Sequence, residues 1–288
     1  MRTSCRGAGM PCEVIVNVDN PHEAGLWAQA ANASEGALVP IFSANLHEAR
    51  GYNRGAKAAR GKILIIWQDD QTPPPTHGWL QDLVRLYDTY PRLGVIGMNT
   101  YRLCSFKEPT NRFGDAPWAV DARTGVQWTY AQNVDFAPFA IRAHMFTELG
   151  MLEEGSSRPG DCGIWGDWEL CQRAWAAGWQ VGFYGLHGRG SDGRAGGTHS
   201  YVSGEKCWGQ QQHVSSSLYH KRYAAMESYA IDVCVHVWKL NLQTFSVGGG
   251  CPYGTHDTRW PDNCTLPEGL GRLPRRAAAA RARAAALA

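Results

Sequence analysis

The strongest constraint on the fold is an unbroken apolar strand with an acidic pair close behind it. Residues 63–67 read ILIIW, and such a continuous apolar run is typical of a strand covered on both faces. Asp69 and Asp70 follow almost at once, before the prolines at 73–75. Side chains at the carboxyl end of a central parallel strand lie in the crevice where open α/β sheets bind ligands. Paired carboxylates also suit a hard divalent cation, so the pattern predicts a Mg²⁺ or Mn²⁺ site.

The two aspartates also have a plainer interpretation. Aspartate is favoured before Thr-Pro-Pro, so Asp69 and Asp70 could be ordinary turn residues. Their position after a five-residue apolar strand nevertheless favours the ligand-binding interpretation over the structural one.

The segment before this strand predicts a helix with a face of small side chains. Ala49, Tyr52, Ala56 and Ala59 recur at spacings of three and four, which places them on one helical face. Gly61 follows as a typical C-terminal stop. A face with so little bulk allows the helix to lie close against a sheet.

Strands and helices alternate along the first part of the chain. Strands are predicted at 13–18 and 38–42, with a helix at 24–33 between them. A further helix at 79–90 and a strand at 94–98 follow the apolar run. This alternation predicts an α/β fold with a mostly parallel central sheet flanked by helices, a Rossmann-like three-layer arrangement.

Charge and hydropathy argue against nucleic acid as a partner and against a membrane-spanning segment. The formal net charge of the 288 residues is +2, so no global field favours nucleic acid. No apolar run approaches the roughly 20 residues that span a bilayer. The basic Ala/Arg-rich tail at 272–288 could touch nucleic acid or lipid headgroups, but such tails are more often solvated ends.

Cysteines and sequons leave the compartment open. The nine cysteines form no CxxC pair and no zinc-type spacing, and a disulfide framework is not implied. Sequons at Asn32 and Asn263 favour the Golgi and secretory pathway, whereas residues 1–12 lack the apolar core of a signal peptide and favour the cytoplasm. Four cysteines in polar, loop-like surroundings could pair in an oxidising compartment: Cys162, Cys207, Cys251 and Cys264.

A second informative stretch lies at residues 150–184. A glycine-rich loop leads to Asp167, a helix follows to Ala177 with Gly178 as its stop, and a strand is predicted at 180–184. Asp167 fits two interpretations, a helix N-cap or a general base facing the ligand crevice. Histidines at 187 and 199 in the following loop could be metal ligands or ordinary loop residues.

Taken together, the two stretches resemble two motifs of the family-two glycosyltransferases, which have the GT-A fold. The resemblance covers about residues 13–185. The first motif is matched by Asn45, Gly51, Asn53, Gly55, Ala59, Gly61, Asp69, Asp70 and Pro73. The second is matched by Gly150, Glu153 or Glu154, Asp167, Glu169, Leu170, Arg173 and Gly178, with Gly166 in place of the family's usual glutamate.

The resemblance implies a nucleotide-diphospho-sugar donor, for which we expect UDP as the carrier. Asp70 would bind the metal on the diphosphate, and Asp69 would lie nearer the ribose or sugar. Asp19, at the end of the strand at 13–18, would contact the base, and Asn45 and Asn53 complete the expected donor site. The family's late histidine ligand to Mn²⁺ or Mg²⁺ corresponds to His199 or His187.

The resemblance also implies an acceptor side. Asp167 would deprotonate the hydroxyl of a carbohydrate, protein or lipid acceptor, which attacks the anomeric carbon and inverts it. Trp165 and Trp168 beside it would form an acceptor-stacking wall. Two other functions remain open: a non-catalytic GT-A-like module that binds sugar or nucleotide, and a nucleotidyltransferase.

Three segments are expected along the chain. The family opens with a strand and helix for which the 12 residues before Glu13 are too few, so residues 1–12 are expected to be a remnant of a truncated N-terminus. Residues 13–245 would form the GT-A-like domain. Residues 246–288 would form a loop-rich, flexible tail.

Overall fold

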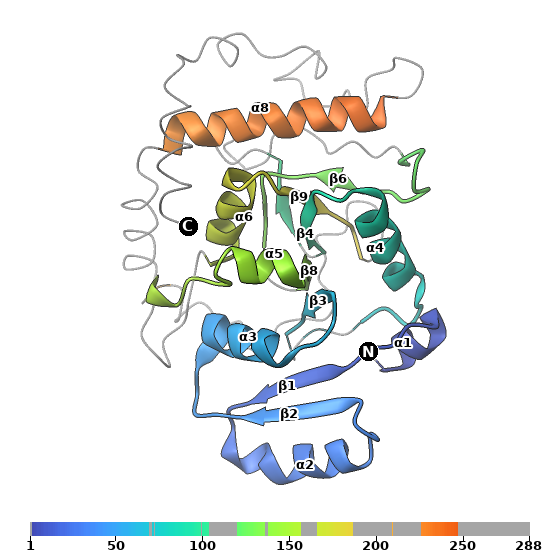
Figure 1. Ribbon diagram of the computed structural model, residues 1–288, viewed down its shortest axis with the longest axis vertical. Helices are drawn as coiled ribbons and strands as arrows, with labels where there is room; N and C mark the ends of the chain where they lie inside the picture. Colours follow the sequence, from blue (N-terminus) through green and yellow to red (C-terminus); the bar gives the residue numbers. More distant parts are fainter. Residues whose placement is uncertain are drawn as a thin grey trace.

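A computed structural model gives the architecture of the chain (Figure 1). The structure describes residues 2–68, 71, 73–98, 100–103, 120–135, 138–156, 166–186, 209 and 226–246. An N-terminal β-α-β unit precedes a central sheet with helices on both faces, and a long helix follows near the end of the described chain.

The N-terminal unit contains two parallel strands joined by a helical crossover. β1 (Val14–Val18) pairs in parallel with β2 (Leu38–Phe42). The crossover consists of the 3₁₀ helix η1 (Pro21–Glu23) and α2 (Ala24–Asn32). Parallel strands require a connection of this length, so the predicted β-α-β order is confirmed here.

The central sheet has five strands in the order β3-β8-β4-β9-β6. β3, β4 and β9 run in one direction, because β8 is antiparallel to both β3 and β4, and β4 pairs in parallel with β9. β6 is antiparallel to β9. The strands are β3 (Ile63–Ile66), β4 (Leu93–Gly97), β6 (Thr129–Tyr130), β8 (Phe139–Arg142) and β9 (Gln180–Phe183).

The position of β8 makes this sheet mixed, although the α/β class is as predicted. Phe139, Ala140 and Ile141 are each at most 2% exposed, so successive residues of β8 are covered on both faces of the sheet. A strand buried on both faces belongs in the middle of a sheet, and β8 lies between β3 and β4. The residue pattern at 134–141 predicts an extended segment but does not place it inside the sheet. A separate antiparallel pair, β5 (Tyr101–Arg102) and β7 (Asn133–Val134), lies nearby.

Helices cover both faces of the central sheet. Figure 1 shows the strands between α4 (Gly78–Thr89) on one side and α5 (Ala143–Glu148) with α6 (Gly166–Ala176) on the other. Large side chains that are almost fully buried fill the interior, among them Leu83, Leu86, Ile96, Phe146 and Phe183. The three-layer prediction is therefore confirmed.

The helix α8 (Met226–Phe245) covers the edge strand β6 (Figure 1). The buried Asn241 accepts hydrogen bonds from the Tyr130 N–H (2.9 Å) and the Thr129 hydroxyl (3.1 Å), and donates to the Tyr130 carbonyl (3.1 Å). An amide that pairs with an exposed strand edge satisfies backbone groups that would otherwise recruit another strand. Within the described ranges, neither this helix nor any other is long and apolar enough to cross a membrane.

β1 and β2 form their own two-stranded sheet, although the sequence predicted that they would share a sheet with β3. α3 (His47–Ala58) packs on β1 and leads into β3. Glu13, just before β1, forms an ion pair with Arg60 (2.8 Å), just before β3. The Arg60 backbone N–H and guanidinium lower the pKa of Glu13. Side chains and α3 therefore connect the two sheets, without backbone pairing between β1 and β3 in the described residues.

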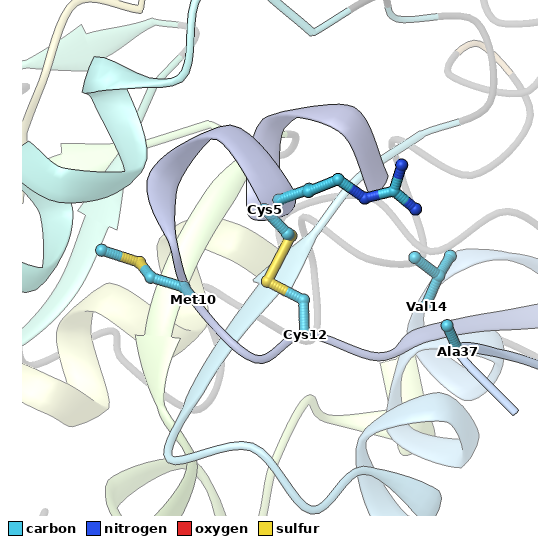
Figure 2. Close-up of a pocket in the computed structure, with 6 residues that line it drawn as sticks. Cys5, Met10, Cys12, Val14 and Ala37 are labelled. Carbon is cyan, nitrogen blue, oxygen red and sulfur yellow. A yellow bond between two sulfur atoms is a disulfide. The ribbon is translucent and has the colours of Figure 1, made fainter.

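A disulfide that the cysteine spacing does not predict closes the N-terminal segment. α1 (Arg2–Ala8) carries Cys5, which is bonded to Cys12, and Figure 2 shows this bond joining the helix to the chain that enters β1. Gly7 lies so close to His77, at the start of α4, that a Cβ there would come within 2.6 Å of the imidazole. Residues 1–12, expected to be a remnant, thus contain a helix packed onto α4.

Two further cysteines lie in the described residues. Cys234 in α8 is disulfide-bonded, whereas Cys171 in α6 has a buried thiol outside any disulfide. Burial raises the pKa of Cys171, so its reactive thiolate is disfavoured. The four cysteines that could pair in an oxidising compartment, at 162, 207, 251 and 264, lie outside the described residues.

Candidate functional site

The predicted metal and sugar ligands follow β3. Asp69 and Asp70 lie outside the described residues, but the residues on either side of them are fixed. The Gln71 N–H donates to the Gln68 carbonyl (3.3 Å), and the Trp67 indole donates to the Gln71 carbonyl (2.8 Å). The two ends of this short interval are therefore tied together at the carboxyl end of β3.

Asp19 and Asn45 follow β1 and β2. Val18 and Phe42, the last residues of these strands, are register partners, so Asp19 comes directly after a paired position. Asp19 is half-buried, and the exposed Asn45 accepts a hydrogen bond from the His47 N–H (3.1 Å) at the start of α3. Both residues follow the carboxyl ends of parallel strands, and their donor-binding roles stay predictions.

Asn53 joins α3 to the loop that leads toward α6. Its side chain is 2% exposed, and its Oδ1 accepts from the Leu152 N–H (2.9 Å). Its Nδ2 donates to the Leu152 carbonyl and to Glu154 Oε1 (2.8 Å each). Arg50, one turn earlier, donates to the Glu154 carbonyl (2.5 Å). These contacts give Asn53 a structural role, while a contact with the donor stays a prediction.

The same loop is held from its other side by α6. Arg173 forms an ion pair with Glu169 one turn earlier (2.7 Å), and both side chains are mostly buried. Its guanidinium also donates to the carbonyls of Leu149 and Met151, the latter at 2.6 Å. Asn53 and Arg173 therefore clamp residues 149–154 between α3 and α6, so residues from both sequence motifs meet in one hydrogen-bonded network.

The first turn of α6 carries the predicted base. Asp167 is half-buried, and its Oδ1 accepts a hydrogen bond from the Trp168 N–H (2.8 Å). The Trp168 indole donates to Asp135 Oδ1 (2.9 Å). The structure thus brings Asp167, Trp168 and Asp135 together. No motif in the sequence singles out Asp135, which directly follows β7, a short strand in an antiparallel pair.

The other predicted site residues, Trp165, His187 and His199, lie outside the described residues. Among the described residues, no cluster of three or more His, Cys, Asp or Glu side chains could hold a metal ion. The predicted ligands Asp70 and His199 or His187 are all outside that set. A carboxylate and an imidazole are both donors that Mn²⁺ accepts, and carboxylate oxygens also suit Mg²⁺.

The contacts by which Asn53 holds residues 152–154 predict that its substitution strongly lowers the stability of the fold. In Asn53→Ala, a buried N–H and carbonyl of Leu152 lose their partners, and we expect a loss of about 2–3 kcal/mol in the free energy of unfolding. Urea unfolding at a constant m-value measures this change. Asn32→Ala, at an exposed helix end, is the matched control and should change stability by less than about 0.5 kcal/mol. Equal effects of the two substitutions would contradict the clamp.

Residues 3–143 match the family model described as glycosyl transferase family 2. This region belongs to glycosyltransferase family 2. The family region contains the predicted donor residues, and α6 with Asp167 follows it along the chain. The members within the region are Asp19, Asn45, Asn53, Asp69 and Asp70.

Two further comparisons concern the whole chain. No curated protein matches its sequence significantly. Among solved structures, the chain is similar to the crystal structure of GalNAc-T7 with UDP, GalNAc and Mn²⁺, with a TM-score of 0.48 and 13% sequence identity. That match covers 61% of this chain and 36% of the GalNAc-T7 chain.

Proposed function

We propose that this family 2 glycosyltransferase moves a sugar from a nucleotide-diphospho-sugar to an acceptor hydroxyl with inversion at the anomeric carbon. The network around residues 149–154 carries the proposal. It connects α3, which leads into β3 and the acidic pair, to α6, which carries Asp167. A donor site and a base held by one buried network can keep the fixed geometry that in-line displacement needs.

On the donor side, Asp70 with His199 or His187 would hold Mn²⁺ or Mg²⁺. The bound cation would offset the charge that develops on the leaving diphosphate. Asp69 would contact the ribose or sugar, and Asp19 the base, with UDP as the proposed carrier. Asn45 would complete the site, while Asn53 fixes the surrounding chain.

On the acceptor side, Asp167 would take the proton of the attacking hydroxyl. The acceptor oxygen forms a bond to the anomeric carbon as the bond from that carbon to the diphosphate oxygen breaks. Attack opposite the leaving group inverts the anomeric configuration. A carboxylate within hydrogen-bond reach of the hydroxyl is a suitable general base. The acceptor would be a carbohydrate, protein or lipid, with Trp165 and Trp168 beside it.

Removal of the metal tests the proposed donor site. Chelation with EDTA should lower release of nucleoside diphosphate from a panel of sugar nucleotides by at least about 100-fold. A bound cation would stabilise the charge that develops on the leaving diphosphate by several kcal/mol. Added Mn²⁺ or Mg²⁺ should restore release. Full activity in EDTA would contradict metal dependence. Metal-dependent donor binding without release for any acceptor tried would favour a non-catalytic binding module, and release of pyrophosphate would favour a nucleotidyltransferase.

A further inference from the structure

Asp135 has no role in the reaction as described so far, yet it is hydrogen-bonded to the residue beside the candidate base. We propose that Asp135 is a positioning residue, which fixes Trp168 and thereby orients the carboxylate of Asp167. This inference rests on the proposed function, because it takes Asp167 to be the base. Asp135 itself need not touch either substrate.

Trp168 is bound at two points by the two aspartates. Its indole Nε1 donates to Asp135 Oδ1 (2.9 Å), and its backbone N–H donates to Asp167 Oδ1 (2.8 Å). A shift of Trp168 therefore moves the donor that holds the Asp167 carboxylate. The indole bond to Asp135 restrains such a shift.

Asp135 is in turn anchored to the β5–β7 pair. Its backbone N–H donates to the Thr100 carbonyl (3.1 Å), and the Thr100 hydroxyl donates to its Oδ2. The Arg102 guanidinium lies 3.8 Å from the same oxygen and 5.8 Å from the centre of the Trp168 ring. Arg102 therefore contacts both members of the Asp135–Trp168 pair, and the first turn of α6 is tied to a strand pair on a separate part of the chain.

This anchoring matters because a general base acts only within hydrogen-bond reach of the proton it abstracts. A displacement of about 1 Å at a reacting group can cost on the order of 10²-fold in rate. The loss of the indole bond should therefore reduce turnover and leave the donor site, which lies on other elements, largely unchanged.

The test combines Trp168→Phe, which removes the indole N–H and keeps an aromatic ring, with Asp135→Ala. Each should lower kcat at least about 10-fold, with the KM for the donor within about twofold of the unmutated value. Because both substitutions remove the same bond, the double variant should be no slower than the slower single variant. Asp135→Asn, which keeps an oxygen acceptor for the indole, should recover most of the loss.

Trp175→Phe is the matched control on the same helix. Its indole donates to the Gln132 carbonyl (3.0 Å), so the substitution also removes a buried indole hydrogen bond, but far from Asp167 along α6. It should lower stability and leave kcat unchanged. If Trp168→Phe and Asp135→Ala behave like this control, or if their effects on kcat add fully, the positioning role is overturned.

Nuclear magnetic resonance of the labelled protein distinguishes a failure of this inference from a failure of the proposed function. In protein labelled with ¹⁵N-tryptophan and ¹⁵N-aspartate, the Trp168 indole signal is the one missing from Trp168→Phe. Asp135→Ala should move that signal and also the backbone amide signal of Asp167. If no sugar nucleotide supports transfer, the proposed function fails, yet these shifts would still support the link from Asp135 to Asp167. An Asp167 signal that does not move in Asp135→Ala overturns the inference whatever the activity.

Discussion

Asp167→Asn should lose sugar transfer while it retains donor and metal binding. Asparagine has nearly the same shape, and its side-chain oxygen can still accept the Trp168 N–H, so α6 should keep its position. It has no carboxylate to take the proton of the acceptor hydroxyl. The loss of a general base typically costs about 10²–10⁴-fold in rate. Acceptor-dependent release of nucleoside diphosphate measures the loss, and calorimetric titration with the donor measures retained binding.

Asp88→Asn is the control for the change in charge, since Asp88 is exposed on α4. It should transfer sugar at the unmutated rate. If Asp167→Asn also does so, Asp167 is not the base. If Asp167→Asn loses donor binding together with transfer, the residue belongs to the donor site.

Asp70→Ala should lose metal-dependent donor binding as well as turnover. Asp70 would hold the cation that neutralises the diphosphate, so removal of the carboxylate should weaken both metal binding and donor binding. We expect at least about a 100-fold loss in kcat/KM, the rate equivalent of several kcal/mol. Titration with Mn²⁺, followed by calorimetry or by electron paramagnetic resonance of the free ion, measures metal affinity directly.

Asp69→Ala is the informative comparison for this second prediction. Asp69 is assigned to the ribose or sugar, so this variant should keep its affinity for Mn²⁺ and bind the donor more weakly. Unchanged affinity for Mn²⁺ in Asp70→Ala would contradict the assignment of the metal ligand. The opposite pattern, with metal binding lost in Asp69→Ala alone, would exchange the two roles.

Much of the α/β architecture could be predicted because local signals agree with the fold. The apolar runs at 38–42 and 63–67 begin and end within one residue of β2 and β3. The amphipathic pattern at 79–90 and the buried run at 94–98 likewise match α4 and β4. In each case the pattern of apolar residues within the segment specifies whether it forms a helix or a strand, and turn residues mark its ends.

Pairing between distant segments could not be predicted in the same way. The sequence indicates that residues 134–141 are extended, but not that part of this segment inserts between β3 and β4. α1 contains Gly7 within a short segment, so its helix depends on packing against His77 and on the Cys5–Cys12 bond. The sequence predicts a helix at 218–237, whereas α8 extends to Phe245, because Asn241 pairs with β6. Such tertiary contacts override local propensity.

In the candidate site too, the sequence identifies individual residues, whereas the contacts between them appear only in the structure. Motif spacing singled out Asn53, Glu169 and Arg173, but only the structure shows that they hold the loop at 149–154 together. Asp135 carries no motif of its own, and its importance appears only through its hydrogen bond with Trp168. Sequence spacing therefore identified which residues to examine, whereas their partners depended on the three-dimensional arrangement.

The central claim is inverting sugar transfer, and the stereochemistry of the product tests it most directly. The chain, supplied with Mn²⁺, an α-linked sugar nucleotide and an acceptor, should release one nucleoside diphosphate for each sugar transferred. Nuclear magnetic resonance of the initial product should then show a β-linkage. An α-linked product would contradict inversion and the role of Asp167 as base, and the absence of any transferred sugar across donors and acceptors would contradict the proposed function itself.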